Sequence, residues 1–194
     1  MEASKYMEKN IYLKTLKLFG SKGSRFTTED LARELGTSKR TIYSYFSNKN
    51  EIIEKTIDFI FSEIIASDTK ILENNELTLQ EKIKLYFKNI PDAYNLSLII
   101  QHMDDLKQYY PYVWERVNNH LNTIWDSGIR IVEQGIKNGE LEEIDTDILK
   151  LMLNETLKKL LDYEFLAKNR VSFDSGLKAM NNIILYGLIK RKDD

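Results

Sequence analysis

The chain has 194 residues, of which 42% are hydrophobic and 30% charged, which is the composition of a globular protein of one or two small domains rather than of a disordered segment. It has no cysteine, which excludes disulfides, thiolate metal sites and cysteine nucleophiles. No run of about 18 uncharged apolar residues could span a membrane, and the N-terminus lacks the apolar stretch of a secretory signal, so we expect a cytoplasmic location.

Charge is distributed unevenly along the chain. The formal net charge is −2, but residues 1–50 hold ten Lys and Arg against five Asp and Glu, while the remainder holds 18 against 25. A basic segment followed by an acidic remainder suits a protein that contacts phosphate with one end. Chance asymmetry in a mixed surface is the alternative interpretation.

Four helices are predicted over the first 72 residues, at about 4–19, 27 or 28 to 35, 37 or 38 to 45, and 47 or 48 to 72. Gly20 and Gly23 end the first, and Gly36 ends the second. Thr27 with Asp30 resembles a capping box, in which the two residues satisfy each other's backbone N–H groups.

Five more helices are predicted at about 78–90, 93–107, 112–138, 145–168 and 172–189, with Pro91, Pro111 and Asn138-Gly139 as boundaries. No strand or hairpin signal is present. The sequence therefore predicts an all-α protein of about nine helices. We expect a three-helix N-terminal domain over residues 1–50 and a larger helical domain over 51–194.

The segment from residue 27 to 46 follows the helix-turn-helix plan. Two short helices are joined by a turn in which Gly36 supplies a positive φ. The second helix would bury Ile42 and Phe46, four residues apart. Its other face would present Lys39, Arg40, Thr41, Tyr43 and Ser44. Apolar anchors behind and hydrogen-bond donors in front are what a helix needs to read the DNA major groove.

In this region the sequence resembles the tetracycline-repressor (TetR) family of bacterial transcriptional regulators. The resemblance covers about residues 11–53 and is carried by Ile11, Leu16, Phe19, Gly23, Thr28, Leu31-Ala32, Gly36, Ser38-Lys39, Thr41-Ile42-Tyr43, Tyr45-Phe46 and Lys49. It implies a DNA-binding repressor that is not an enzyme and uses no cofactor or metal.

The resemblance also implies roles for the matching positions. The expected DNA-binding residues are Thr28, Ser38, Lys39, Arg40, Thr41, Tyr43, Tyr45 and Lys49. Thr28 and Tyr43 would bind phosphates, and Lys49 would add its charge to the start of the fourth helix. Position 40 is often glycine in this family, so Arg40 is a departure. Its guanidinium could read a guanine or hold a phosphate.

The remainder of the chain would, by the same resemblance, form homodimers and bind a small effector. The expected dimer interface comprises Leu153, Leu157, Leu160, Leu177, Met180, Ile184 and Leu188. The expected pocket, suited to an aromatic or lipophilic ligand, comprises Tyr86, Phe87, Tyr94, His102, Met103, Trp114, His120 and Trp125. Both sets could instead be ordinary core residues. Effector binding would tilt the fourth helix and move two recognition helices off a palindromic operator.

Other functions stay open at this point. The chain could be a helical enzyme or ligand-binding protein with a non-functional helix-turn-helix, although no Gly-rich phosphate loop, His-Glu-x-x-His motif or nucleophile elbow is present. The basic N-terminal helix could lie on an anionic membrane. An activator and a repressor cannot be told apart from the sequence.

Overall fold

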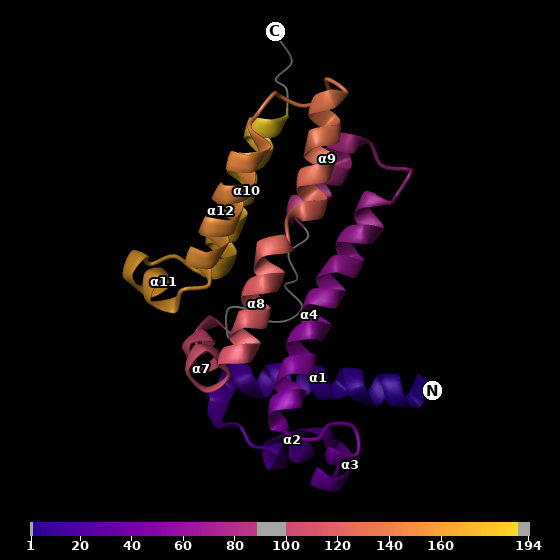
Figure 1. Ribbon diagram of the computed structural model, residues 1–194, viewed down its shortest axis with the longest axis vertical. Coiled ribbons are helices and arrows are strands. Elements are labelled where there is room, and N and C mark those ends of the chain that lie inside the picture. The colour runs from indigo at the N-terminus through magenta and orange to yellow at the C-terminus, as the bar shows by residue number, and fades with distance from the viewer. Residues whose placement is uncertain (1, 89–99, 190–194) are drawn as a thin grey trace. The chain divides into compact units, whose positions relative to one another are not determined.

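The computed structural model describes residues 2–88 and 100–189, which form helices joined by short turns (Figure 1). Within these residues the one β-bridge pairs Leu141 with Ile189. No described helix combines the length and the hydropathy that a membrane span needs. The predicted all-α class is confirmed.

The described residues form two compact units, with boundaries inside α4 and α8. Unit 1 comprises residues up to 62 and 100–118, and unit 2 comprises 63–88 and 119–189. Unit 1 contains α1 (Glu2–Lys22), the 3-10 helix η1 (Gly23–Arg25), α2 (Thr28–Leu35), α3 (Lys39–Tyr43), the first part of α4 (Lys49–Leu72), α7 (Met103–Tyr109) and most of α8 (Pro111–Thr123). Unit 2 contains the rest of α4 and α8, with α5 (Leu79–Lys88), α9 (Asp126–Lys137), α10 (Thr146–Leu160), α11 (Tyr163–Asn169) and α12 (Phe173–Leu188).

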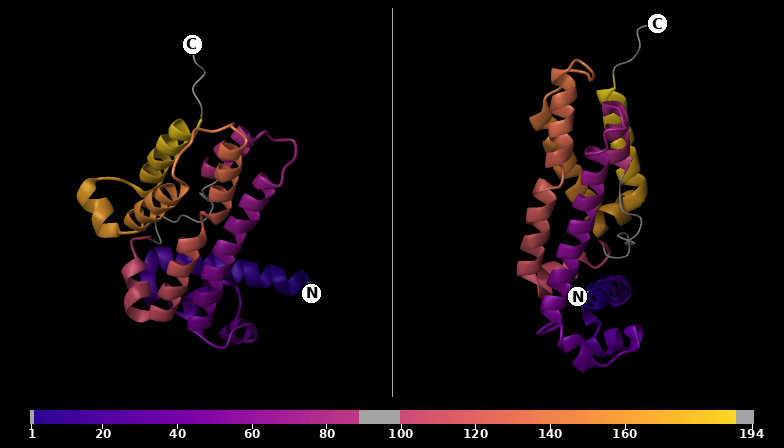
Figure 2. Two further views of the ribbon diagram at one scale, coloured as in Figure 1. Left: turned by 45° about the horizontal axis from the view of Figure 1, so that its top comes forward. Right: turned by 90° about the vertical axis from the view of Figure 1, so that its right-hand side faces the viewer.

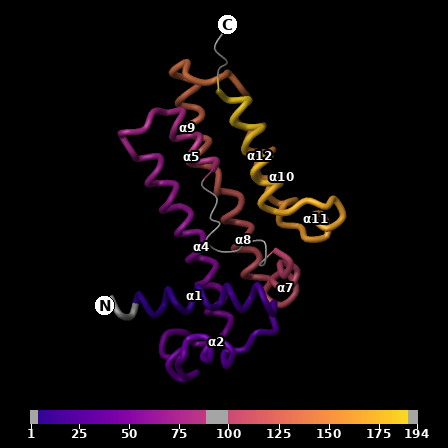
Figure 3. The backbone as a smooth tube through the Cα atoms, turned by 180° about the vertical axis from the view of Figure 1, so that it is seen from behind, coloured from indigo at the N-terminus to yellow at the C-terminus, as the bar shows by residue number. Residues whose placement is uncertain are grey.

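Unit 1 packs α2 along α1, as the backbone trace shows (Figure 3). Ile11 of α1, Leu31 of α2 and Ile42 of α3 are fully buried, and Ile52 of α4 joins them. Burying such side chains is worth about 1.5–3 kcal/mol each, which is what fixes the short helices α2 and α3 on the longer ones.

Unit 2 is a helical core in which α5 contacts α9 and α12, and α10 lies beside α12 (Figure 2). Phe87, Val132, Leu153 and Leu188 supply fully or almost fully buried side chains from these four helices. The bridge between Leu141 and Ile189 holds the chain after α9 against the end of α12.

The predicted dimer stripe packs inside the single chain. All seven of its side chains are between 1% and 8% exposed. The 3.6-residue period located the apolar face of each helix correctly, but that face closes the core of unit 2. The exposed apolar side chains of α10 and α12 are different ones, namely Ile148, Leu151, Met152, Ile183 and Tyr186.

Two of the predicted long helices are each divided in two. The segment 112–138 breaks between α8 and α9, where the Tyr86 hydroxyl donates to the Ile124 carbonyl (3.1 Å). The segment 145–168 breaks between α10 and α11, because the Asp162 side chain accepts from the Phe165 N–H (3.0 Å) and starts a new helix. The predicted helix 93–107 falls partly outside the described residues, which contain α7 in its place.

Candidate DNA interface

The start of α2 is fixed by a reciprocal cap. Thr27 Oγ1 accepts from the Asp30 N–H (3.1 Å), and the Asp30 carboxylate accepts from the Thr27 N–H (2.9 Å), which confirms the predicted capping box. Lys22 donates to the other Asp30 oxygen (2.8 Å), and this bond with those from Thr27 holds the pKa of Asp30 well below its usual value. Thr28, the first residue of this fixed helix start, is 8% exposed.

The turn between α2 and α3 depends on Gly36, whose φ is +61°. The N–H of Thr37 donates back to the Ala32 carbonyl (2.9 Å), which closes the end of α2. Ser38 then caps α3, because its Oγ accepts from the Thr41 N–H (3.1 Å) and shares a hydrogen bond with Thr41 Oγ1 (2.9 Å). Ser38 and Thr41 thus hold the first turn of α3 in place.

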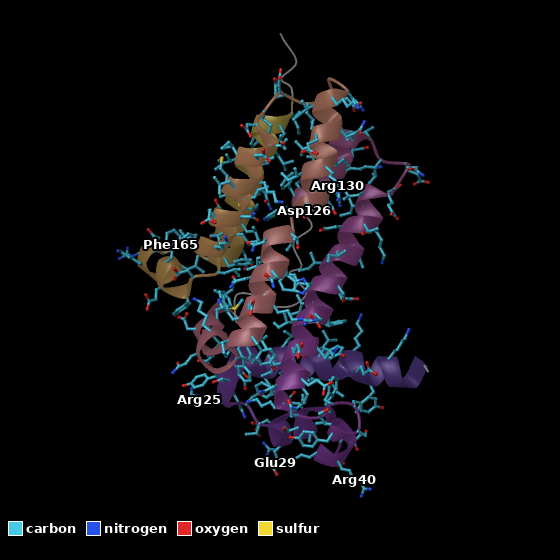
Figure 4. All side chains as sticks on the ribbon, in the orientation of Figure 1. Arg25, Glu29, Arg40, Asp126, Arg130 and Phe165 are labelled. Carbon is cyan, nitrogen blue, oxygen red and sulfur yellow. The ribbon has the colours of Figure 1, made fainter. Side chains whose placement is uncertain are left out.

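The two faces of α3 differ as the sequence predicted. Ile42 and the following Phe46 are buried, while Lys39 and Arg40 are exposed and Tyr43 is 44% exposed. Figure 4 shows Arg40 projecting away from the end of unit 1 that carries α2 and α3. Within residues 2–88 and 100–189 no hydrogen bond or ion pair engages its guanidinium. This side chain is available to a ligand outside the chain.

Two contacts tie α2 to α3 across the turn. Thr28 Oγ1 and the Tyr43 hydroxyl share a hydrogen bond of 2.9 Å. Lys39 Nζ lies 3.4 Å from Glu29 Oε1, in a pair whose side chains are both largely exposed. The structure therefore brings together the two residues expected to bind phosphate, and it places the Glu29 carboxylate beside Lys39.

Tyr45 and Lys49 are partly buried within unit 1, and Thr28 is 8% exposed. Tyr45 is half-buried with its ring 6.5 Å from that of Phe46. Lys49 Nζ donates to the Ser24 carbonyl (2.6 Å) and lies 4.3 Å from the ring centre of Phe26. The ammonium group of Lys49, expected to add its charge to the start of α4, is thus engaged within unit 1.

Arg25 is a residue that sequence reasoning left out of the interface. It is exposed in η1, two residues before the cap of α2, and it projects from the same end of unit 1 as Glu29 and Arg40 (Figure 4). Its place in the basic N-terminal segment, directly before a predicted helix start, is the signal that could have identified it.

The expected effector-binding residues divide between the units. Tyr86, Phe87 and Trp125 form a buried aromatic cluster in unit 2, with ring centres 5.4 to 6.4 Å apart. Trp125 Nε1 is buried there without a hydrogen-bond partner among the described residues. His120 also belongs to unit 2.

His102, Met103 and Trp114 belong instead to unit 1, where His102 meets the ring of Phe19 edge-on at 6.1 Å. Tyr94 lies outside the described residues. A small apolar cavity in unit 1, lined by Phe19, Ile53 and Leu106 among others, has a volume of about 20 Å³. It has room for about one water molecule and is far smaller than an effector pocket of about 300–1,000 Å³.

Two short helices joined by a left-handed glycine turn, with one exposed polar helix face, define a helix-turn-helix protein. The family model for bacterial regulatory proteins of the tetR family matches residues 11–56. YvaF, an HTH-type transcriptional regulator of Bacillus subtilis, is 26% identical over 182 residues, covering 94% of this chain and 95% of that protein. An HTH-type regulator of Haemophilus influenzae is 29% identical over 158 residues, covering 80% and 81%.

The fold agrees with these matches. A transcriptional regulator from Saccharomonospora viridis, crystallised in complex with choline, superposes with a TM-score of 0.72 at 18% identity, covering 96% of this chain and all of that one. Residues 11–56 thus match the N-terminal part of the tetR family, and over nearly its whole length the chain is similar to DNA-binding transcriptional regulators.

Proposed function

We propose that the protein is a repressor that binds a palindromic operator as a homodimer and is released by a small molecule. The observation that carries the proposal is α3, which is anchored by Ile42 and Phe46 and exposes Lys39 and the unengaged Arg40. The expected interface residues lie before residue 50, so residues 1–50 are the DNA-binding domain in this proposal and 51–194 the effector and dimerisation domain.

Homodimer formation would use the exposed apolar side chains of α10 and α12. Ile148, Leu151 and Met152 follow one face of α10, since they are three and four residues apart. Ile183 and Tyr186 are three apart on α12. These five side chains are between 50% and 79% exposed in the single chain. Exposed apolar side chains on two neighbouring helices favour a self-complementary two-fold interface.

The effector would bind in unit 2 near the aromatic cluster of Tyr86, Phe87 and Trp125. Besides Trp125 Nε1, the buried side-chain oxygens of Asn154 and Asn181 have no hydrogen-bond partner among the described residues. Because buried polar atoms are rarely left unpaired, they support a ligand that has an aromatic or lipophilic body and complementary polar groups. One regulator with this fold binds choline, so choline belongs in any first panel of candidates.

Release from DNA would follow from a population shift. Helix α4 contributes residues to both units, so a ligand that prefers one position of α4 would favour one position of the DNA-binding domain. Two recognition helices must enter successive major grooves about 34–36 Å apart, and a change in their separation would weaken binding.

The first experiment is selection from random DNA duplexes at about 150 mM salt, which suppresses non-specific binding. A double variant, Arg40→Ala with Tyr43→Phe, is the control. We expect the native protein to enrich a palindrome that the variant does not recover. Equal and weak recovery of unrelated sequences by both proteins would overturn the proposal.

The effector is tested separately with the recovered duplex. Candidate aromatic, lipophilic and cationic compounds, including choline, are screened for a rise in thermal unfolding midpoint and then for release of the duplex. We expect a stabilising compound to lower DNA affinity, and Trp125→Phe to reduce its effect.

A reporter gene placed behind the recovered sequence shows whether the protein represses or activates transcription. Increased expression on deletion of the gene indicates a repressor, whereas decreased expression contradicts that part of the proposal.

A further inference from the structure

The peptide units of Ser24, in the connection between α1 and α2, are held from both sides. Its N–H donates to Asp105 Oδ2 of α7 (2.6 Å), and its carbonyl accepts from Lys49 Nζ at the start of α4 (2.6 Å). Both bonds involve a charged partner, which shortens and strengthens a hydrogen bond. Two separate helices therefore hold one residue of the chain that leads into the helix-turn-helix.

The surroundings of Lys49 keep its ammonium group inside unit 1. Nζ lies 4.3 Å from the ring centre of Phe26 and 5.9 Å from that of Tyr110, so two aromatic rings and the Ser24 carbonyl lie close to it. Burial lowers the pKa of Lys49, while the charge of Asp30 acts in the opposite direction. The ammonium group already donates to the Ser24 carbonyl and lies over two aromatic rings, which leaves fewer of its three N–H donors for a phosphate.

The same connection is closely covered by the start of α7 and the residues before it. Gly23 has a φ of +58°, and a Cβ there would lie 2.2 Å from Asp105 Oδ2 and 2.7 Å from His102 Nδ1. Gln101 Nε2 donates to the Gly20 carbonyl (3.2 Å). The last turn of α1 and η1 are thus fitted against residues 101–105.

The geometry points to Lys49 and Asp105 as positioning residues that together clamp Ser24 and so set the orientation of α2 and α3 for DNA. Ser24 lies three residues before Thr27, the cap of α2, and Thr28 is bonded to Tyr43 of α3. A displacement of the backbone at Ser24 would therefore shift α2 and, with it, the recognition helix α3. In this inference Lys49 acts through Ser24 and makes no phosphate contact, contrary to the role expected from its position in the sequence.

The test uses Lys49→Met, which keeps the aliphatic stem and removes the charge, and Asp105→Asn. The matched control is Asp104→Asn, which makes the same charge change on the same helix at a largely exposed residue paired with Lys107 (2.9 Å). Affinity for the selected duplex is measured across a salt series. A phosphate-binding lysine contributes about 0.9 to the slope of log affinity against log salt.

We expect Lys49→Met and Asp105→Asn each to bind about tenfold more weakly, as for loss of one charged hydrogen bond. The salt slope of Lys49→Met should stay unchanged. Asp105→Asn should weaken binding although it removes a negative charge, while Asp104→Asn should bind as well as the native protein or slightly better. A slope reduced by about one for Lys49→Met, or native affinity for Asp105→Asn, would overturn the clamp.

Hydrogen exchange of the free, full-length protein tests the clamp without DNA. We expect faster exchange at the Ser24 amide in Asp105→Asn than in Asp104→Asn, with unit 2 unchanged. If the two variants exchange at the same rate, the clamp is refuted whatever their DNA affinity. If the clamp is present in exchange but no duplex is ever selected, the proposed function fails and the clamp stands as a structural feature. If Asp105→Asn does not fold, the clamp is tested by Lys49→Met alone, whose slope of log affinity against log salt should equal that of the native protein.

Discussion

Arg40 is exposed on α3 with no recorded partner among the described residues, and we predict that it reads a base. Arg40→Ala should cost about 1–3 kcal/mol on the selected duplex, the value of a bidentate contact to guanine. The loss should vanish on duplexes changed at one particular base pair. Affinities for a set of single-base-pair variants provide the measurement. Uniform weakening on every duplex would show that Arg40 holds a phosphate instead.

Glu29 places a carboxylate beside Lys39 at the surface expected to meet DNA. The Lys39–Glu29 pair is exposed at 3.4 Å and adds little stability, about 0–1 kcal/mol. Glu29→Gln should therefore leave the thermal midpoint nearly unchanged and bind DNA a few-fold more tightly, because it removes repulsion of phosphate and frees Lys39. The control variant is Glu34→Gln, because native Glu34 forms ion pairs with Lys14 and Lys17 and not with Lys39. Weaker binding by Glu29→Gln would mean that Glu29 positions Lys39.

At the residue scale, the sequence predicted the features that depend on the nearest residues along the chain. The Thr27 cap, the positive φ of Gly36 and the buried Ile42 follow from side-chain type and spacing. The partner of Lys49 did not follow, because Ser24 lies 25 residues away along the chain and only the folded unit brings the two together.

At the scale of elements, the difference between local causes and long-range contacts also explains the divided helices. Apolar periodicity continues across residues 112–138, but the helix is interrupted at Ile124. The carbonyl of Ile124 there accepts from the hydroxyl of Tyr86, 38 residues earlier in the chain. The break at Asp162 has a local cause, since aspartate is a favoured helix cap, and a closer reading of that residue could have found it.

The Tyr86 contact predicts how stability responds to alkaline pH. Burial, with the nearby charges of Asp68 and Asp126, raises the pKa of Tyr86 above its ordinary value of 10.0. The unfolded chain then loses this proton at lower pH than the folded one, so the contribution to stability is complete below pH 10 and is lost as pH rises further.

Tyr86→Phe removes both the hydrogen bond and this titration. At pH 7 the variant should be less stable by about 1 kcal/mol, because the Ile124 carbonyl loses its donor. Between pH 10 and 11 the difference should narrow, as the native protein loses stability faster. Urea unfolding midpoints from pH 7 to 11 measure both effects. If the difference in unfolding midpoint between the native protein and the variant stayed constant from pH 7 to 11, the pKa of Tyr86 would not be raised by folding.

At the scale of the whole molecule, the sequence located the apolar faces of the last helices but could not say what covers them. Leu153 and Leu157 could face a second copy or the chain's own core, because a 3.6-residue stripe looks the same in both cases. The structure buries them within unit 2 and leaves Leu151 and Ile183 of the same helices exposed. Their exposure follows from how α10 and α12 pack together, which periodicity alone does not determine.

A double variant, Leu151→Lys with Ile183→Lys, should convert the protein to a monomer, since it places charges in the centre of the proposed interface. Ile65→Lys is the control, because Ile65 is 55% exposed on α4, comparable to Leu151. Sedimentation at micromolar concentration should show the control as a dimer and the double variant at the mass of one chain.

The monomer should retain the folded DNA-binding domain and lose most of its affinity for the palindrome, because two linked half-sites bind more tightly than one. Its affinity for a duplex with a single half-site should equal that of the native protein, which separates loss of assembly from damage to α3. A double variant that stays dimeric would place the interface elsewhere on the chain. A monomer with undiminished affinity for the palindrome would show that dimer formation is not needed to read DNA.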